Sequence, residues 1–272
     1  MSRLRTADLL KLSWLALATL TLAPFQIASL RLGSGQRVPL LFHRLVCRTL
    51  GVRIVQRGTP PEGGGLIVAS HVSWLDIPVL GSLRPLSFVS KAEVAEWPVA
   101  GWLARLQRTV FIDRNRRSAT AAVAGRMGER LAAGEAIVLF AEGTTGDGTR
   151  ILPLRSSLLG AAHEAIGADS DAEVTLYPLT ITYTGWHGLP GGRAGRAELA
   201  WYGDTELAPH LRTVLARGAI DVELAWGEPI RMGRAVSRKQ AASRAERTIR
   251  DARRAVVSGQ QAAGVSRAPD PR

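Results

Sequence analysis

Cysteine and lysine are scarce in this sequence, and the shortage of cysteine narrows the classes of protein to which it can belong. The single cysteine, Cys47, cannot form an internal disulfide, so nothing supports an oxidising compartment. One cysteine and five scattered histidines do not provide the usual ligand spacing of a zinc site, and we predict no metal site. The P-loop pattern and the Gly-x-Ser-x-Gly pattern are also missing, which removes the clearest nucleotidase and hydrolase signals.

Positive charge, in contrast, is abundant and is carried almost entirely by arginine. The 272 residues include 35 basic and 23 acidic side chains, and three of the basic ones are lysine, which leaves 32 arginines. The formal net charge of +12 suits an anionic surface, either phospholipid or nucleic acid. An arginine bias also follows from genome composition, so the charge by itself does not identify a partner.

A charge-free apolar run lies near the N-terminus. Residues 12–30 read LSWLALATLTLAPFQIASL, which is just long enough to span a hydrocarbon core. Basic residues flank the run on both sides and give little orienting bias, while Pro24 and Gln26 weaken a clean span. A spanning helix and a helix that enters and returns therefore both stay open. A signal peptide is a third interpretation, but no convincing small-x-small cleavage site follows.

The following segment, residues 38–52, has an amphipathic pattern. Leu41 and Leu45 fall on one helical face, and Arg44 and Arg48 fall on another. This pattern is typical of a helix at a membrane interface, although an ordinary core helix gives the same one. Because the apolar run precedes it, we assign residues 1–51 to a membrane anchor and interfacial helix.

From residue 52 onward, short β-rich runs alternate with helical stretches, which predicts a mixed, partly parallel α/β sheet flanked by helices. The expected strands are VRIVQ, GLIVAS, LSFVS, TVFID, AIVLF, EVTLYPLTITY, RAELAWY and DVELAW. The close spacing of the last three predicts some antiparallel pairing. Residues 237–257 are expected to form a basic surface helix. We therefore predict one α/β domain over residues 52–257 and a disordered tail over residues 258–272.

Polar residues stand at the ends of several expected strands, where ligands bind in open α/β sheets. The stretch ASHVSWLD places a histidine and an aspartate five residues apart, RTVFIDRNRR is rich in arginine, VLFAEGTTG opens into a turn, and LYPLTI holds a proline. Each has an ordinary structural alternative. The histidine can be a core residue, the arginines a solvated helix start, the turn a plain loop and the proline a sheet edge or bulge.

These four blocks, in this order, resemble the glycerophospholipid acyltransferase family, which includes lysophosphatidate- and phosphatidate-forming enzymes. The resemblance covers residues 52–230, and the N-terminal hydrophobic element is also usual in the family. It implies that His71 is the general base that takes a proton from an acceptor hydroxyl. It also implies that Asp76 orients the histidine ring and stabilises its charged form. No covalent acyl-enzyme is required, in keeping with the missing serine motif.

The resemblance also implies an acceptor site. Arg114 is expected to grip an acceptor phosphate, and the Glu142-Gly143-Thr144 turn to border the same pocket. The sequence departs from the usual family motif, Phe-Pro-Glu-Gly-Thr-Arg, with Ala141 and Thr145 in place of its proline and arginine. Arg150 or Arg155 is expected to supply the missing charge. A third departure is Arg108, which stands where the family has glycine before the Phe-Ile-Asp-Arg strand.

The predicted function is membrane-associated acyl transfer from acyl-CoA or acyl-carrier protein to a lyso-lipid, with no other cofactor and no nucleic acid. We place 1-acyl-glycerol-3-phosphate first as the acceptor, which gives phosphatidic acid, and lyso-ornithine lipid second. A non-catalytic basic protein that binds membranes or nucleic acid is the alternative of another class, but it leaves the ordered motifs unexplained. The expected location is the bacterial inner membrane, with the catalytic domain on its cytoplasmic side.

Overall fold

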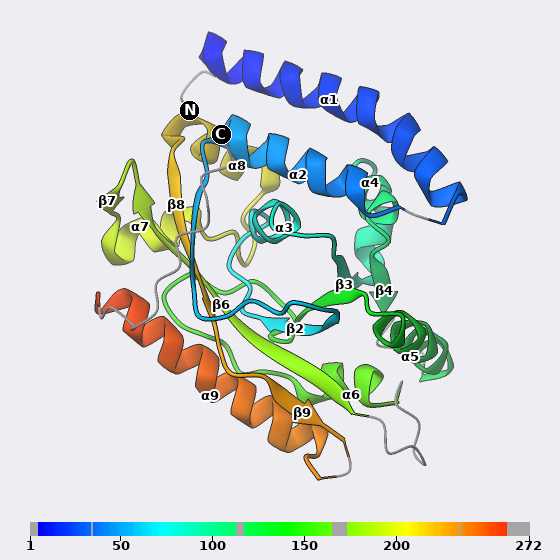
Figure 1. Cartoon of the computed structure of the whole chain (residues 1–272). Coiled ribbons are helices and arrows are strands. Elements are labelled where there is room, and N and C mark those ends of the chain that lie inside the picture. The colour runs from blue at the N-terminus through cyan, green and yellow to red at the C-terminus, as the bar shows by residue number, and fades with distance from the viewer. Residues whose placement is uncertain (1–4, 34, 113–116, 165–172, 234, 260–272) are drawn as a thin grey trace.

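A nine-stranded sheet organises the structure, a computed structural model shown in Figure 1. The structure describes residues 5–33, 35–112, 117–164, 173–233 and 235–259. The strand order is β1-β8-β6-β2-β5-β3-β4, and β7 and β9 also pair with β6. The strands are β1 (Arg53–Arg57), β2 (Gly65–Ala69), β3 (Ser87–Lys91), β4 (Val110–Ile112), β5 (Ala136–Phe140), β6 (Val174–Trp186), β7 (Leu189–Pro190), β8 (Ile220–Trp226) and β9 (Ile230–Met232).

The central strands are apolar because both of their faces are covered. Every residue of β5 is buried, and so is every residue of β2 after Gly65. Alternate side chains of β2 enter two separate cores, with Ile67 in one and Leu66 in the other. This continuous apolar pattern is typical of parallel strands between helical layers.

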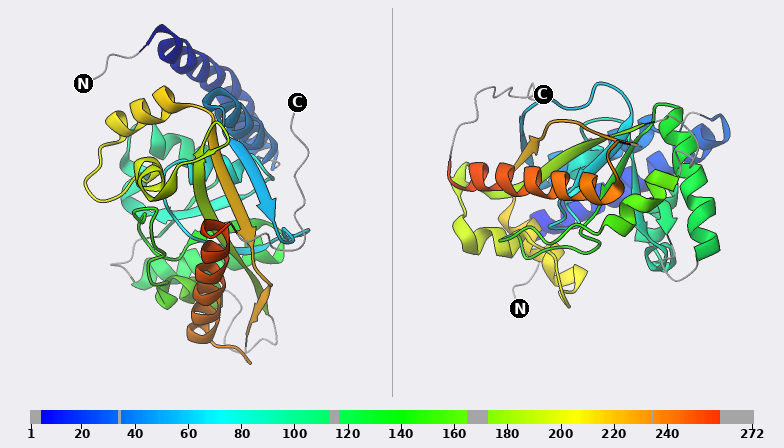
Figure 2. Two further views of the ribbon diagram at one scale, coloured as in Figure 1. Left: turned by 90° about the vertical axis from the view of Figure 1, so that its left-hand side faces the viewer. Right: turned by 90° about the horizontal axis from the view of Figure 1, so that it is seen from below.

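Helices cover both faces of the sheet. Helices α2, α3, α7 and α8 contribute to the core on one face, and α5, α6 and α9 to the core on the other. Figure 1 and the left view of Figure 2 show α1 and α2 on one side of the sheet and α9 on the other. The helices are α1 (Thr6–Arg31), α2 (Arg37–Leu50), α3 (Asp76–Gly81), the 3-10 helix η1 (Ala92–Glu96), α4 (Ala100–Leu106), α5 (Arg117–Ala132), α6 (Ser156–Glu164), α7 (Gly192–Leu199), α8 (Leu207–Arg217) and α9 (Arg238–Val257).

The predicted fold class is confirmed. Strands β2 to β5 pair in parallel, while β6 runs antiparallel to β8 and β9. The basic helix also forms as α9, and the Ser237 side chain caps it by accepting the amide of Gln240. Pro178 lies inside the sheet, on a strand between β2 and β8, and not at an edge.

One predicted strand is wrong. The stretch RAELAWY forms the end of α7 and the loop after it. Its alternation of small and large residues imitates a strand, but Gly195 and Leu199, four residues apart, are the buried pair on α7. Alanine, glutamate and leucine favour a helix, and burial at a spacing of four residues satisfies the helical period.

Helix α1 packs against the domain along part of its surface only. Leu12 and Leu15 contact the core on the side of α2, while Leu10, Leu20 and Phe25 are more than 60% exposed. In the described part of the chain, α1 is the one helix long and apolar enough to cross a membrane, and 17% of its most apolar window is buried. The predicted tail falls largely on residues 260–272, which lie outside the described residues.

Candidate functional site

His71 and Asp76 are joined directly where β2 ends and α3 begins. His71 Nδ1 lies 2.8 Å from Asp76 Oδ2. The Asp76 side chain is completely buried, whereas the His71 side chain is 18% exposed. A carboxylate only accepts hydrogen bonds, so Nδ1 carries the ring proton and Nε2 of the neutral imidazole has a free lone pair. This arrangement can accept a proton at Nε2.

Both oxygens of Asp76 are held by further donors. Oδ2 also accepts the backbone amides of Val72 at 2.7 Å and Ser73 at 3.1 Å. Oδ1 accepts the hydroxyl of Tyr183 from β6 at 2.7 Å. Burial, followed by the nearby Asp76 charge, raises the pKa of Tyr183 well above its usual value. Tyr183 therefore stays a protonated donor.

Glu142 fixes the backbone around His71. Its Oε1 accepts the amide of His71 and its Oε2 the amide of Leu152, both at 2.9 Å. The carbonyl of His71 in turn accepts the amide of Gly146 at 2.8 Å. Burial raises the pKa of Glu142 to about 7, and the two amide hydrogen bonds oppose this rise. The strand-end loop after β5 and the one after β2 are thus tied to each other.

A large apolar cavity of about 910 Å³ opens beside His71. Its wall is built from α1, α2, α3, α4 and the carboxyl ends of the central strands, with Phe140 stacked on the His71 ring at a centroid distance of 3.8 Å. Among the described lining residues, Lys91 and Glu93 alone carry a formal charge at neutral pH. A cavity of this size and character suits a long hydrocarbon chain.

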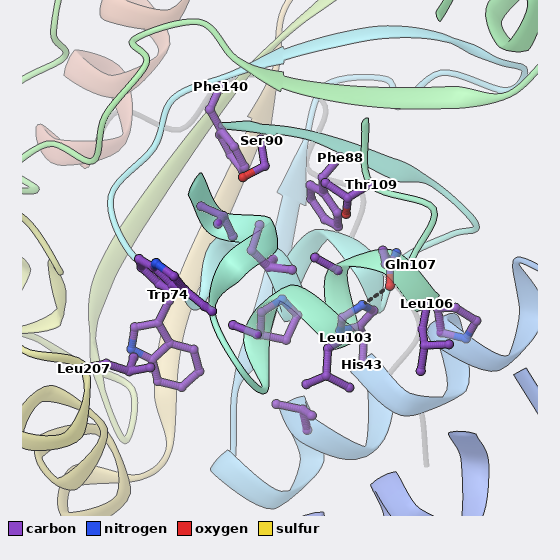
Figure 3. Close-up of a pocket in the computed structure, with 18 of the residues that line it drawn as sticks. His43, Trp74, Phe88, Ser90, Leu103, Leu106, Gln107, Thr109, Phe140 and Leu207 are labelled. Carbon is purple, nitrogen blue, oxygen red and sulfur yellow. Dashed lines mark hydrogen bonds between the residues drawn. The ribbon is translucent and has the colours of Figure 1, made fainter. Parts of the chain in front are cut away.

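Polar side chains interrupt the wall away from His71. Figure 3 shows His43 joined to Gln107, on the side of the cavity opposite Phe140 and Trp74. His43 Nε2 lies 2.6 Å from Gln107 Oε1, and the Gln107 amide nitrogen donates to the carbonyl of Leu86 at 3.0 Å. Burial lowers the pKa of His43 to about 4, so its ring is neutral at pH 7 and this part of the wall carries no charge.

The predicted acceptor residues do not all reach the cavity. Gly143 and Thr144 line it. Glu142 is 2% exposed and directs its carboxylate to backbone amides. Arg155 is exposed and does not belong to the cavity wall. Arg114 lies outside the described residues, and the structure describes β4 as far as Ile112.

Comparisons with known proteins agree on one family. A sequence profile described as Acyltransferase matches residues 51–182. A lyso-ornithine lipid O-acyltransferase from Brucella abortus is 45% identical over 89% of this chain and 92% of its own length. The chain belongs to the glycerophospholipid acyltransferase family. It is an acyltransferase.

Further members of this family differ in how much of the chain they match. A lyso-ornithine lipid O-acyltransferase from Rhizobium meliloti is 40% identical over 94% of this chain and 91% of its own length. A 1-acyl-sn-glycerol-3-phosphate acyltransferase from Neisseria meningitidis is 33% identical over 44% of this chain and 48% of its own length. The crystal structure of the 1-acyl-sn-glycerophosphate acyltransferase from Thermotoga maritima has the same fold, with a TM-score of 0.54, 21% identity and coverage of 83% of this chain and 80% of that one.

This acyltransferase departs from the usual family motifs at Arg108 and Thr145, and the structure shows where both residues lie. Arg108, which stands where the family has glycine, has a φ of 58°, in the left-handed region. Its guanidinium lies 2.9 Å from Glu135 Oε1, and its carbonyl accepts a hydrogen bond from Arg130 at 2.9 Å. Thr145, which replaces the motif arginine, lines the cavity. The motif cation is thus absent from that wall position, while Arg108 adopts a backbone conformation that favours glycine.

Three residues of this candidate site carried no prediction from the sequence. Lys91 and Glu93 line the cavity because β3 ends at Lys91, at the same edge of the sheet as His71. The strand-end rule that selected His71 applies equally to Lys91. Tyr183 had no sequence signal, since its contact with Asp76 joins positions 107 residues apart.

Proposed function

We propose that this acyltransferase moves a fatty acyl chain from a thioester, acyl-CoA or acyl-carrier protein, to the free hydroxyl of lyso-ornithine lipid. One observation carries the chemistry: the His71–Asp76 pair lies in the wall of a 910 Å³ apolar cavity. The pair can provide a base, and the cavity can hold a hydrocarbon chain beside it.

In the proposed reaction, His71 Nε2 takes the proton of the acceptor hydroxyl as its oxygen attacks the thioester carbonyl. Asp76 keeps the proton on Nδ1 and stabilises the imidazolium that forms. The tetrahedral intermediate then collapses with cleavage of the carbon–sulfur bond. The imidazolium returns its proton to the leaving thiolate, so the products are an ester and a free thiol. No covalent acyl-enzyme intermediate forms in this reaction.

The acceptor assignment follows the relatives that match nearly the whole chain, which are named for lyso-ornithine lipid. The sequence alone placed 1-acyl-glycerol-3-phosphate first, but the two Neisseria relatives of that name match 44% of the chain, and the Thermotoga maritima structure, at 21% identity, shares the fold alone. Thr145 also replaces the motif arginine expected at a phosphate site. Among the described lining residues, Lys91 and Glu93 provide one cation and one anion, which fits a head group with a carboxylate and an amine better than a phosphate monoester with nearly two negative charges.

The site residues take distinct proposed roles. Gly143 and Thr144 border the acceptor, since both line the cavity. Glu142 positions His71 through its backbone amide and does not contact the acceptor. Arg114 stays a proposed contact for an acceptor anion. We no longer propose Arg155 for the acceptor because it lies outside the cavity wall.

We further propose that α1 holds the enzyme on the cytoplasmic leaflet of the bacterial inner membrane. Its exposed face carries the large apolar side chains Leu9, Leu10, Trp14, Leu17, Leu20 and Phe25. Its opposite face lines the cavity through Leu12, Leu15 and Leu22. A helix with these two faces lies along the interface and places lipid beside the cavity, a position that a helix crossing the membrane alone does not provide.

The test is an acceptor assay on the full-length protein in detergent micelles. We expect kcat/KM with lyso-ornithine lipid to exceed that with 1-acyl-glycerol-3-phosphate by at least about tenfold. In the Arg114→Ala variant, the loss is expected to be larger with the phosphate acceptor than with lyso-ornithine lipid. A preference of the wild-type protein for the phosphate acceptor would overturn the acceptor and leave acyl transfer standing, whereas no acylation of either would overturn the proposed function.

A further inference from the structure

Tyr183 reaches the buried carboxylate of Asp76 from the middle of the sheet. Its hydroxyl is 2.7 Å from Asp76 Oδ1, and the tyrosine side chain is 2% exposed. In the described structure, Tyr183 is the one hydrogen-bond donor to Oδ1, while Oδ2 accepts from His71, Val72 and Ser73. The charge of Asp76 is therefore divided between an oxygen that faces the histidine and one that faces a phenol.

We propose that Tyr183 is a positioning residue for acyl transfer, which sets how strongly Asp76 holds the protonated form of His71. The inference rests on the proposed role of His71 as the base. It adds a residue from β6 that neither the motifs nor the resemblance of the sequence assigns.

The local backbone supports a specific placement of Tyr183. The pairing of β6 with β8 shifts register between Tyr183 and Gly185. Such bulges re-aim side chains and occur next to active sites. Without its partner, Asp76 Oδ1 would be a charged oxygen with no hydrogen bond in a completely buried position, which is strongly unfavourable.

The effect on His71 has a definite direction. The Tyr183 hydroxyl draws negative charge toward Oδ1 and away from the oxygen that faces His71. Replacing Tyr183 with phenylalanine removes the donor and concentrates the charge on Oδ2, where it stabilises the imidazolium. Because the base must be neutral to accept a proton, the acid limb of the pH–activity profile is expected to move to higher pH.

Other titratable groups near the pair do not change this direction. Tyr183 itself remains protonated, and burial raises the pKa of Cys47, which faces Tyr183 from α2, to about 12, so neither group ionises near pH 7. Glu142, with a pKa of about 7, titrates in the same pH range. It is present in both wild-type and Tyr183→Phe proteins, so its contribution is common to the two profiles. The remaining charged residues of the described cavity wall, Lys91 and Glu93, are likewise unchanged.

The experiment compares wild type, Tyr183→Phe and the matched control Tyr177→Phe in the full-length protein. Tyr177 lies on the same strand, where it pairs with Ile67, six residues and about 20 Å from Tyr183. For Tyr183→Phe, we expect the acid limb to rise by about half a pH unit, so that kcat measured on that limb falls about threefold, and KM for both substrates to stay within about twofold. Tyr177→Phe is expected to retain the wild-type profile.

Two further measurements separate positioning from a general loss of structure. In an Asp76→Asn background, Tyr183→Phe is expected to cost less than about twofold, because its route to His71 has already been removed. The ring nitrogens of His71 are also titrated by NMR, with no substrate present. An unshifted acid limb together with an unshifted His71 titration, or full additivity with Asp76→Asn, would overturn the inference. If wild type acylates neither acceptor, the proposed function fails, and the NMR titration still decides the role of Tyr183.

Discussion

Glu142 holds His71 by the backbone and not by the ring, with Oε1 accepting the His71 amide at 2.9 Å. Its second oxygen secures Leu152 at the same distance. The carboxyl group is almost fully buried, and burial raises its pKa from 4.5 to about 7. One acidic group thus connects the placement of the proposed base with the pH dependence of stability.

The first prediction concerns the stability contributed by Glu142. Because its pKa is higher in the folded protein than in the unfolded chain, the protonated carboxyl contributes stability fully below about pH 4.5, and this contribution is lost as the pH rises through about 7. The free energy of unfolding of wild type relative to Glu142→Gln is therefore expected to fall over this range, by on the order of 3 kcal/mol. Denaturant unfolding at pH 5 and pH 8 measures it, and parallel curves for the two proteins would contradict the prediction.

The second prediction tests the proposed role of His71 as the base. His71→Ala is expected to lower kcat by ~10²–10⁴ while the fold is retained, and Asp76→Asn to cost nearly as much. His187→Asn is a suitable control, since His187 is exposed and has a φ of 52°, which asparagine tolerates. Turnover of His71→Ala above about a third of the wild-type value would rule out His71 as the base.

The third prediction concerns membrane attachment through α1. Removing everything before Val52 would also remove Val46 and Leu50, which belong to the core, so truncation would damage the fold. The cleaner change replaces Leu10, Leu20 and Phe25 with glutamine, because these side chains are more than 60% exposed. We expect release of the triple variant from membranes at high salt with an unchanged melting temperature.

Leu189→Gln provides the matched control for this release. Leu189 is 71% exposed but belongs to β7 and not to α1. Fractionation of bacterial lysates with and without high salt compares the two proteins. Continued retention of the triple variant, at the level of the control, would show that another surface provides the attachment.

The fourth prediction concerns the strained backbone at Arg108. Its φ of 58° costs a non-glycine residue roughly 1–2 kcal/mol. Arg108→Gly removes this cost and loses one partly exposed ion pair with Glu135, which keeps Arg130 as a partner. We expect Arg108→Gly to have at least the wild-type melting temperature and Arg108→Val a lower one. Equal losses in both variants would show that the Arg108 side chain matters more than its backbone.

Local patterns in the sequence determined those structural features that depend on residues close together in the chain. The uninterrupted apolar runs of β2 and β5 indicated buried parallel strands, since both faces of such strands are covered. The family resemblance implied that Asp76 orients His71, and their short spacing across a strand-to-helix turn permits the contact, which is 2.8 Å. Where two periods compete, as in RAELAWY, the local pattern failed because only packing decides which face is buried.

Only the tertiary structure decided which distant residues meet. Glu142 carries a motif that implied an acceptor contact, but pairing of β2 with β5 brings its carboxylate to the His71 backbone, 71 positions away. Tyr183 is unremarkable in sequence and becomes the partner of Asp76 because β6 lies beside β2. Sheet order is set by the burial of whole strands, a sum over many weak contacts, and no short stretch of sequence contains that sum.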